Sequence, residues 1–192
     1  MTDFAFYFET GWHHIISWNA LDHILFILAL TAIYLLSNWK QVLVLITAFT
    51  IGHSLTLALS VYDIIRFNEK WVEFLIPCTI IITVLFNIFI KEYKSGSLKI
   101  NYFFALFFGL IHGMGFANTI RFMLVKNQAI AIPLISFNIG LEVGQITVVS
   151  FILLTSYILV TKAGLSRKWW IWSLSYVALF FAMKMFQQRW PI

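Results

Sequence analysis

Six long apolar runs, separated by short polar breaks, constrain the fold of this chain more than any other feature. A membrane-spanning helix needs about 20 mostly apolar residues, and its backbone must satisfy its own hydrogen bonds in lipid. Only 11% of the residues are charged, whereas a soluble domain has about a quarter. We therefore predict an all-α polytopic membrane protein with about six transmembrane helices in one bundle and one domain. The expected spans are roughly 20–37, 42–61, 74–90, 101–120, 135–160 and 169–186.

Two regions do not fit a simple span. The aromatic segment before the first span, around residues 4–19, carries several polar groups, so we expect it to lie at the interface or to fold back as a short amphipathic helix. The apolar run at 129–161 is too long for one span, and Pro133 lies near its start. We expect a tilted helix there, with a broken or re-entrant beginning.

The charges indicate a membrane rather than nucleic acid as partner. The net charge is +5, but the basic residues are scattered between the apolar runs. Basic residues in such positions are typical of the segments that flank membrane spans and set their orientation. The single cysteine, Cys78, cannot form an intrachain disulfide. We expect the lipid bilayer and a metal ion as partners, and we leave open whether further copies of the chain join it as an oligomer.

Three of the five histidines, His23, His53 and His112, fall inside different predicted spans. Ionisable groups are costly in lipid, so they usually face the bundle interior or a water-filled cavity and mark a pathway or a site. Imidazole suits zinc, copper, iron and nickel. The pattern predicts a buried site for a divalent transition metal, assembled from several helices.

The surroundings of the first two histidines allow more than one role. Asp22 precedes His23 and could bind the same metal, orient the imidazole, or only cap the helix. Thr50 and Thr56 share one helix face with His53, which favours an interior position, although His53 could simply hydrogen-bond across helices. A histidine outside the spans, such as His14, is usually part of an amphipathic surface, and a low-affinity metal position is the functional alternative.

A carboxylate, Glu142, lies in the fifth apolar run, with Asn138 and Gln145 on its side of the helix. We expect Glu142 to bind the metal, and the two amides to contact Glu142 rather than the metal. Pairing of Glu142 with a buried base, for which Arg121 is the nearest candidate, is the alternative. Gly140 and Gly144, like Gly109 and Gly113 elsewhere, form a Gly-x-x-x-Gly pattern that permits close helix packing.

Four blocks together resemble the HupE/UreJ-like integral membrane proteins, in particular their second, shorter branch. The blocks are DHILFILAL (22–30), TAFTIGHSLTLALS (47–60), FFGLIHGMGFA (107–117) and FNIGLEVGQ (137–145). The resemblance implies a multi-pass protein of the bacterial inner (cell) membrane, of a kind often described as a nickel or cobalt permease connected with hydrogenase or urease. It also implies the metal ligands, which are His14, Asp22, His23, His53, His112 and Glu142.

These observations predict a membrane permease for a divalent transition metal, nickel, cobalt or zinc, rather than an enzyme. The chain has no P-loop, so the driving force would be the cation gradient, the membrane potential or protons. The alternative is an intramembrane metal-dependent hydrolase, in which the same residues hold a catalytic zinc and Asp22 or Glu142 acts as general base. A structural metal site in an assembly factor is the third hypothesis.

Overall fold

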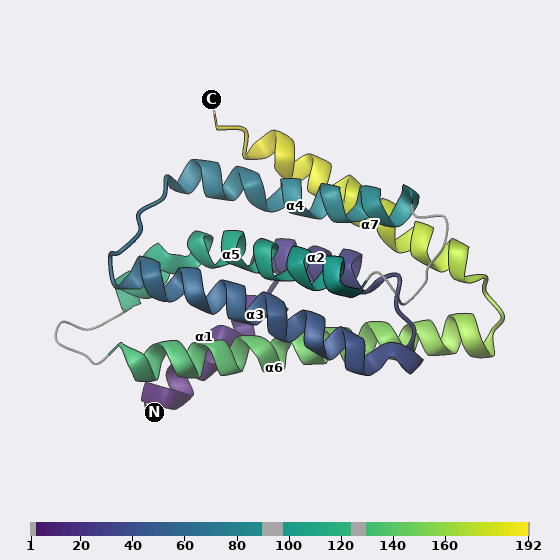
Figure 1. The fold of residues 1–192 in the computed structure, drawn as a ribbon, viewed down its shortest axis with the longest axis horizontal. Helices are drawn as coiled ribbons and strands as arrows, with labels where there is room; N and C mark the ends of the chain where they lie inside the picture. Colours follow the sequence, from purple (N-terminus) through teal and green to yellow (C-terminus); the bar gives the residue numbers. More distant parts are fainter. Residues whose placement is uncertain (1–2, 90–97, 124–129, 192) are drawn as a thin grey trace.

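The computed structural model describes residues 3–89, 98–123 and 130–191, so residue 90, the last of the third expected span, lies outside it. Within these ranges the chain forms helices and no strand (Figure 1), and the all-α prediction is confirmed. The helices are α1 (Asp3–Ile16), η1 (Trp18–Ala20), α2 (Leu21–Thr31), η2 (Leu36–Asn38), α3 (Trp39–Val61), α4 (Glu69–Phe89), α5 (Leu98–Met123), α6 (Ala131–Ser156), η4 (Tyr157–Lys162, a π-helix) and α7 (Arg167–Gln188).

Among the described residues, five segments are long and apolar enough to cross a membrane; four of them contain α3, α4, α6 and α7, and the fifth, Asn101–Arg121, is the middle of α5. Helices α1 and α2 together pass the same test as one broken span, bent by 65° at Ser17–Ala20. The protein is therefore a multi-pass membrane protein, with five or six candidate crossings in the part of the chain that the structure describes. The first crossing differs from the expected run at 20–37, because α2 ends at Thr31 and α1 supplies the other half.

The helices run side by side in one bundle (Figure 1). Helix α4 packs mainly against α7, α3 against α5, and α1 against α6. Figure 1 shows the first and last described residues at the same end of the bundle as the α3–α4 connection, and we call this the terminal end. The α2–α3 and α6–α7 connections lie at the other end.

Glycines bring α3 and α5 into backbone contact beside the histidines. A Cβ atom added at Gly109 would overlap the carbonyl oxygen of Phe49, and one added at Gly113 would overlap that of His53. Gly52 meets the carbonyl of Leu106 in the same way from the other side. The close packing expected from the glycine spacing is confirmed, and it fixes the heights of α3 and α5 relative to each other.

The N-terminal segment is a helix that packs against protein. Gly11 of α1 lies against the carbonyl of Phe137, and Gly140 of α6 lies against the carbonyl of Phe8. These contacts draw α1 onto α6, so that Tyr7 and Ile15 are buried. Helix α1 therefore forms one wall of the bundle.

The interruption expected in the long apolar run is not present between Ala131 and Ser156, where α6 is continuous. Pro133 is the third residue of α6. The first N–H groups of a helix have no intrahelical partner, so a proline there removes no hydrogen bond. The broken crossing in the described structure is the first one, where Ser17 has an extended backbone between α1 and α2.

Candidate metal centre

Four histidines from four helices meet in the interior of the bundle. Potential ligand atoms of His14, His23 and His53 lie within 4.8 Å of one another. The ring centroids are 4.5 Å apart for His14 and His23, and 6.1 Å apart for His53 and each of these two. His112 joins the group through His23, at 5.1 Å between centroids. The helices that supply them are α1, α2, α3 and α5, in chain order.

The imidazoles of this cluster leave nitrogens without partners in the described structure. The Nε2 atoms of His14, His23, His53 and His112 are buried and have no hydrogen-bond partner, and the same holds for Nδ1 of His53. Nearly all buried polar atoms in proteins are hydrogen-bonded, so converging orphan nitrogens call for a ligand. The imidazoles of His14, His23 and His53 form a donor set that suits zinc, nickel or copper, and His112 lies beside it. The residues present therefore fit a divalent transition metal.

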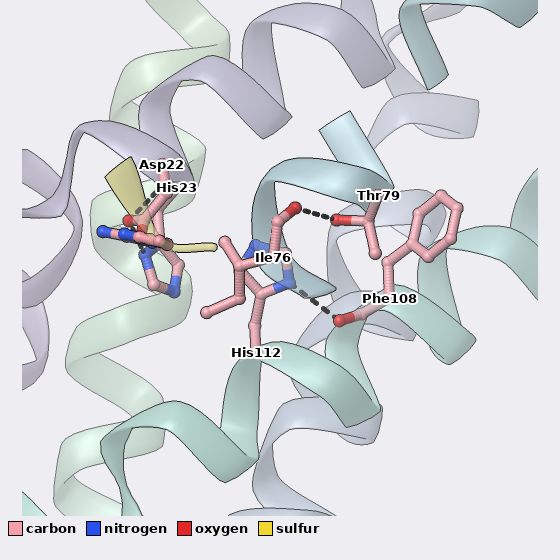
Figure 2. A network of polar contacts seen from close by, with 7 residues as sticks. Asp22, His23, Ile76, Thr79, Phe108 and His112 are labelled. Carbon is pink, nitrogen blue, oxygen red and sulfur yellow. Dashed lines mark hydrogen bonds and ion pairs between the residues drawn. The ribbon is translucent and has the colours of Figure 1, made fainter. Parts of the chain in front are cut away.

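Two of the histidines are held by their other ring nitrogen. Nδ1 of His23 lies 3.0 Å from Oδ1 of Asp22, and Nδ1 of His112 lies 2.8 Å from the carbonyl oxygen of Phe108. Figure 2 shows both contacts, the first at the start of α2 and the second between successive turns of α5. When Nδ1–H donates to an oxygen, the lone pair of Nε2 is left for a metal, and this arrangement is usual behind metal-binding histidines.

Asp22 is almost buried, with 11% of its side chain exposed. Its Oδ1 also accepts a hydrogen bond from the backbone N–H of His23 at 2.9 Å. Its Oδ2 accepts one from Nη1 of Arg189 at 3.0 Å. The N-cap residue of α2 is Ala20, so Asp22 is not the cap itself, although its Oδ1 satisfies one backbone N–H of the first turn. In this structure Asp22 orients His23 and carries the charge that faces Arg189.

The carboxylate expected from α6 lies apart from the histidines. Oε1 of Glu142 accepts a hydrogen bond from Thr47 at 2.8 Å, and Glu142 is not among the atoms that group with the imidazoles in the described residues. Arg121, the alternative partner of Glu142, instead donates to Asp63 at 3.0 Å. The structure thus places Glu142 at the contact between α3 and α6.

The two amides expected behind Glu142 also face other partners. Oε1 of Gln145 accepts a hydrogen bond from Thr50 at 2.9 Å, and both residues are buried. The side-chain N–H of Asn138 donates to the carbonyl of Leu134 on its own helix, and its Oδ1 is a buried atom without a partner in the described structure. Gln145 therefore ties α6 to α3, the helix that carries His53.

A cavity of about 380 Å³ joins the cluster to the terminal end of the bundle. Its walls include the buried His23 and His112 and the exposed Glu73 and Thr119. Arg189 lines it as well. The cavity thus connects His14, His23 and His112 with polar side chains at that end.

Aromatic rings close the other side of the cluster. Phe26 and Phe49 lie 5.3 and 5.2 Å from the ring of His112, and Phe26 packs against Phe108 at 5.7 Å between centroids. All three phenylalanines are buried. Sequence reasoning did not single out these rings, because a phenylalanine in an apolar run carries no sign of its partners. It also took Arg189 only as a flanking charge.

Two comparisons with known proteins returned no match, neither to a curated protein nor to a solved structure. A family model described as HupE / UreJ protein matches residues 1–189. That range contains all four cluster histidines, Asp22 and Arg189. This match covers almost the whole sequence, and the chain belongs to the HupE / UreJ protein family.

Proposed function

We propose that this protein is a permease for a divalent transition metal, nickel, cobalt or zinc, in the bacterial inner membrane. The observation that carries the proposal is the set of four histidines with buried, unpartnered Nε2 atoms, of which His14, His23 and His112 line a cavity that begins at one end of the bundle. Membership of the HupE / UreJ family agrees with it. The metal is cargo in this proposal and not a resident cofactor.

A permease must bind the ion and then release it. The set of ligands around the ion must therefore be able to change. Histidines on four separate helices satisfy this condition, because a small shift of one helix removes one ligand. The first crossing is broken next to the site, and broken helices near the middle of the membrane are typical of transport sites. The break at Ser17–Ala20 would let α1, with His14, move relative to α2.

A second, smaller cavity of about 30 Å³ lies against Phe108. Its lining is almost wholly apolar, and the side chains of Asn87 and Asn101 in its wall already donate hydrogen bonds to the carbonyl of Ala29 and the hydroxyl of Tyr34. Apolar cavities stay dry, so an exit on this side requires the phenylalanines and the helices that carry them to move. In the proposed cycle, the ion reaches the histidines from the terminal end before these rings move.

The intramembrane hydrolase remains the second candidate, because the His14, His23 and His53 group has the three-imidazole composition of some catalytic zinc sites. A hydrolase also needs a carboxylate that can take a proton from the metal-bound water. Asp22, the carboxylate beside the cluster, already accepts hydrogen bonds from His23 and Arg189. This engagement of Asp22 favours transport.

Flux into sealed proteoliposomes tests the proposal. Purified protein should pass nickel, cobalt or zinc faster than empty liposomes, and His53→Ala or His112→Ala should abolish most of the flux and most of the bound metal. Thr147→Ala is the control, because Thr147 is an exposed residue of α6 that donates to the carbonyl of Val143 and does not line the cavity. Stoichiometric metal binding without flux of any of the three ions would refute the permease and leave the enzymatic or structural role.

A further inference from the structure

Arg189 brings a positive charge to the wall of a cavity that is proposed to admit cations. It follows the last residue of α7 and donates from Nη1 to Oδ2 of Asp22 at 3.0 Å, across 167 positions of sequence. Both residues line the cavity that leads to the histidines. A guanidinium at this position repels an incoming divalent cation. Arg189 must therefore have a role other than attracting the ion.

The two oxygens of Asp22 have different tasks. Oδ1 accepts hydrogen bonds from the ring and the backbone of His23, and Oδ2 accepts the one from Arg189. An almost buried carboxylate needs a nearby positive charge, since an unpaired buried charge is strongly destabilising. When no metal ion is bound, Arg189 supplies that charge. A bound divalent ion would supply it instead.

We propose that Arg189 is a tethered counter-cation, which neutralises Asp22 while the histidine site is empty and is displaced by the arriving metal ion. The inference rests on the proposed function. The exchange keeps Asp22 neutralised in both states. It also weakens metal binding by the free energy of the Asp22–Arg189 pair, which favours release.

A second carboxylate lines the same cavity and is the partner that we assign to the displaced guanidinium. This carboxylate is Glu73 of α4, which is exposed. Arg189 is held only by the end of α7 and is itself 26% exposed, so its side chain can swing outward. Glu73 would then stabilise the metal-bound state, and Glu73→Gln should weaken zinc binding.

Zinc titration of the purified full chain in detergent tests this exchange. Arg189→Gln should bind zinc about tenfold more tightly than the wild-type protein, as expected when a charge pair of about 1.4 kcal/mol no longer has to be broken. The same variant should have a lower Tm without zinc, because Asp22 loses its partner. Lys184→Gln removes the same charge from an exposed position on α7 and should change neither quantity.

The opposite signs of these two effects separate exchange from a merely structural tie. A structural ion pair predicts that Arg189→Gln lowers both Tm and zinc affinity, and that result would overturn the proposal. If Arg189→Gln does not fold, Arg189→Lys keeps the charge but holds the carboxylate less well. It should then bind zinc more tightly than the wild-type protein, and an unchanged affinity would refute the exchange.

A double-mutant cycle with Asp22→Asn separates exchange from plain repulsion between Arg189 and zinc. Without the carboxylate there is no pair to break, so Arg189→Gln should not tighten zinc binding in the Asp22→Asn background. A gain of equal size in both backgrounds would mean repulsion only and would overturn the proposal. A wild-type protein that binds no zinc, nickel or cobalt would refute the permease itself, whereas binding without the Arg189→Gln gain refutes only the exchange.

Discussion

Gly113→Ala should loosen the metal site without touching any of its ligands. A Cβ atom at Gly113 would overlap the carbonyl oxygen of His53 and Oγ1 of Thr56. The carbonyl is part of the α3 backbone and cannot rotate away, so α3 and α5 must separate by roughly 1 Å to restore a normal contact. Overpacking of this kind costs about 1–3 kcal/mol. For a chain of this size that corresponds to a fall in Tm of roughly 2–12 °C.

The same separation carries His53 away from the other imidazoles. Loss of correct positioning of one metal ligand typically weakens binding by roughly 10–100-fold. Zinc titration and thermal unfolding in detergent measure both effects. Gly115→Ala is the control on the same helix, because its nearest neighbour is Cδ1 of Ile76 at 3.3 Å, the far end of a flexible side chain. Wild-type zinc affinity in Gly113→Ala would refute the view that backbone contact between α3 and α5 sets the site.

Three further predictions concern single positions. Glu142→Gln should keep wild-type zinc binding, because Glu142 is bonded to a threonine of α3 and lies outside the cluster; zinc loss on titration would instead make Glu142 a ligand. Phe108→Leu should raise zinc flux into proteoliposomes several-fold by thinning the aromatic closure, while the exposed Phe107→Leu should not, and equal flux in both would exclude the ring as a barrier. A hydrogen bond from Arg66 lowers the pKa of Asp63 from 3.8 to about 2. The ionised carboxylate therefore stabilises the folded state above pH 3.8, and this stabilisation is lost as the pH falls towards 2. Tm measured from pH 6 to pH 3 should therefore fall more for the wild-type protein than for Asp63→Asn.

The apolar runs and the interior histidines were accessible from sequence, because both follow from local chemistry. Lipid forces long apolar runs into helices, and the polar face that His53 shares with Thr50 and Thr56 is buried in the structure. The glycine spacing likewise predicted where helices touch. These features depend on residues a few positions apart, and helical periodicity reports such relations directly.

The remaining features depend on contacts between distant segments. Periodicity shows which face of a helix is polar, but not which helix meets that face. The sequence therefore marked Gly140 as a close-packing position but did not identify α1 as its partner, and the contact between Arg189 and Asp22 had no sequence signal. Pro133 suggested a break in the wrong crossing, because its effect depends on whether it lies in the first turn or in the middle of the helix.

The short length of α2 has a consequence for the insertion of the protein into the membrane during its synthesis. With 11 residues, α2 is about 17 Å long and cannot traverse a hydrocarbon layer of about 30 Å alone. Its other half, α1, packs against α6, which is synthesised more than a hundred residues later. Helix α1 therefore lacks its main packing partner until α6 has been synthesised. His14, which α1 carries, then joins the histidines of α2, α3 and α5 only after α6 has been synthesised.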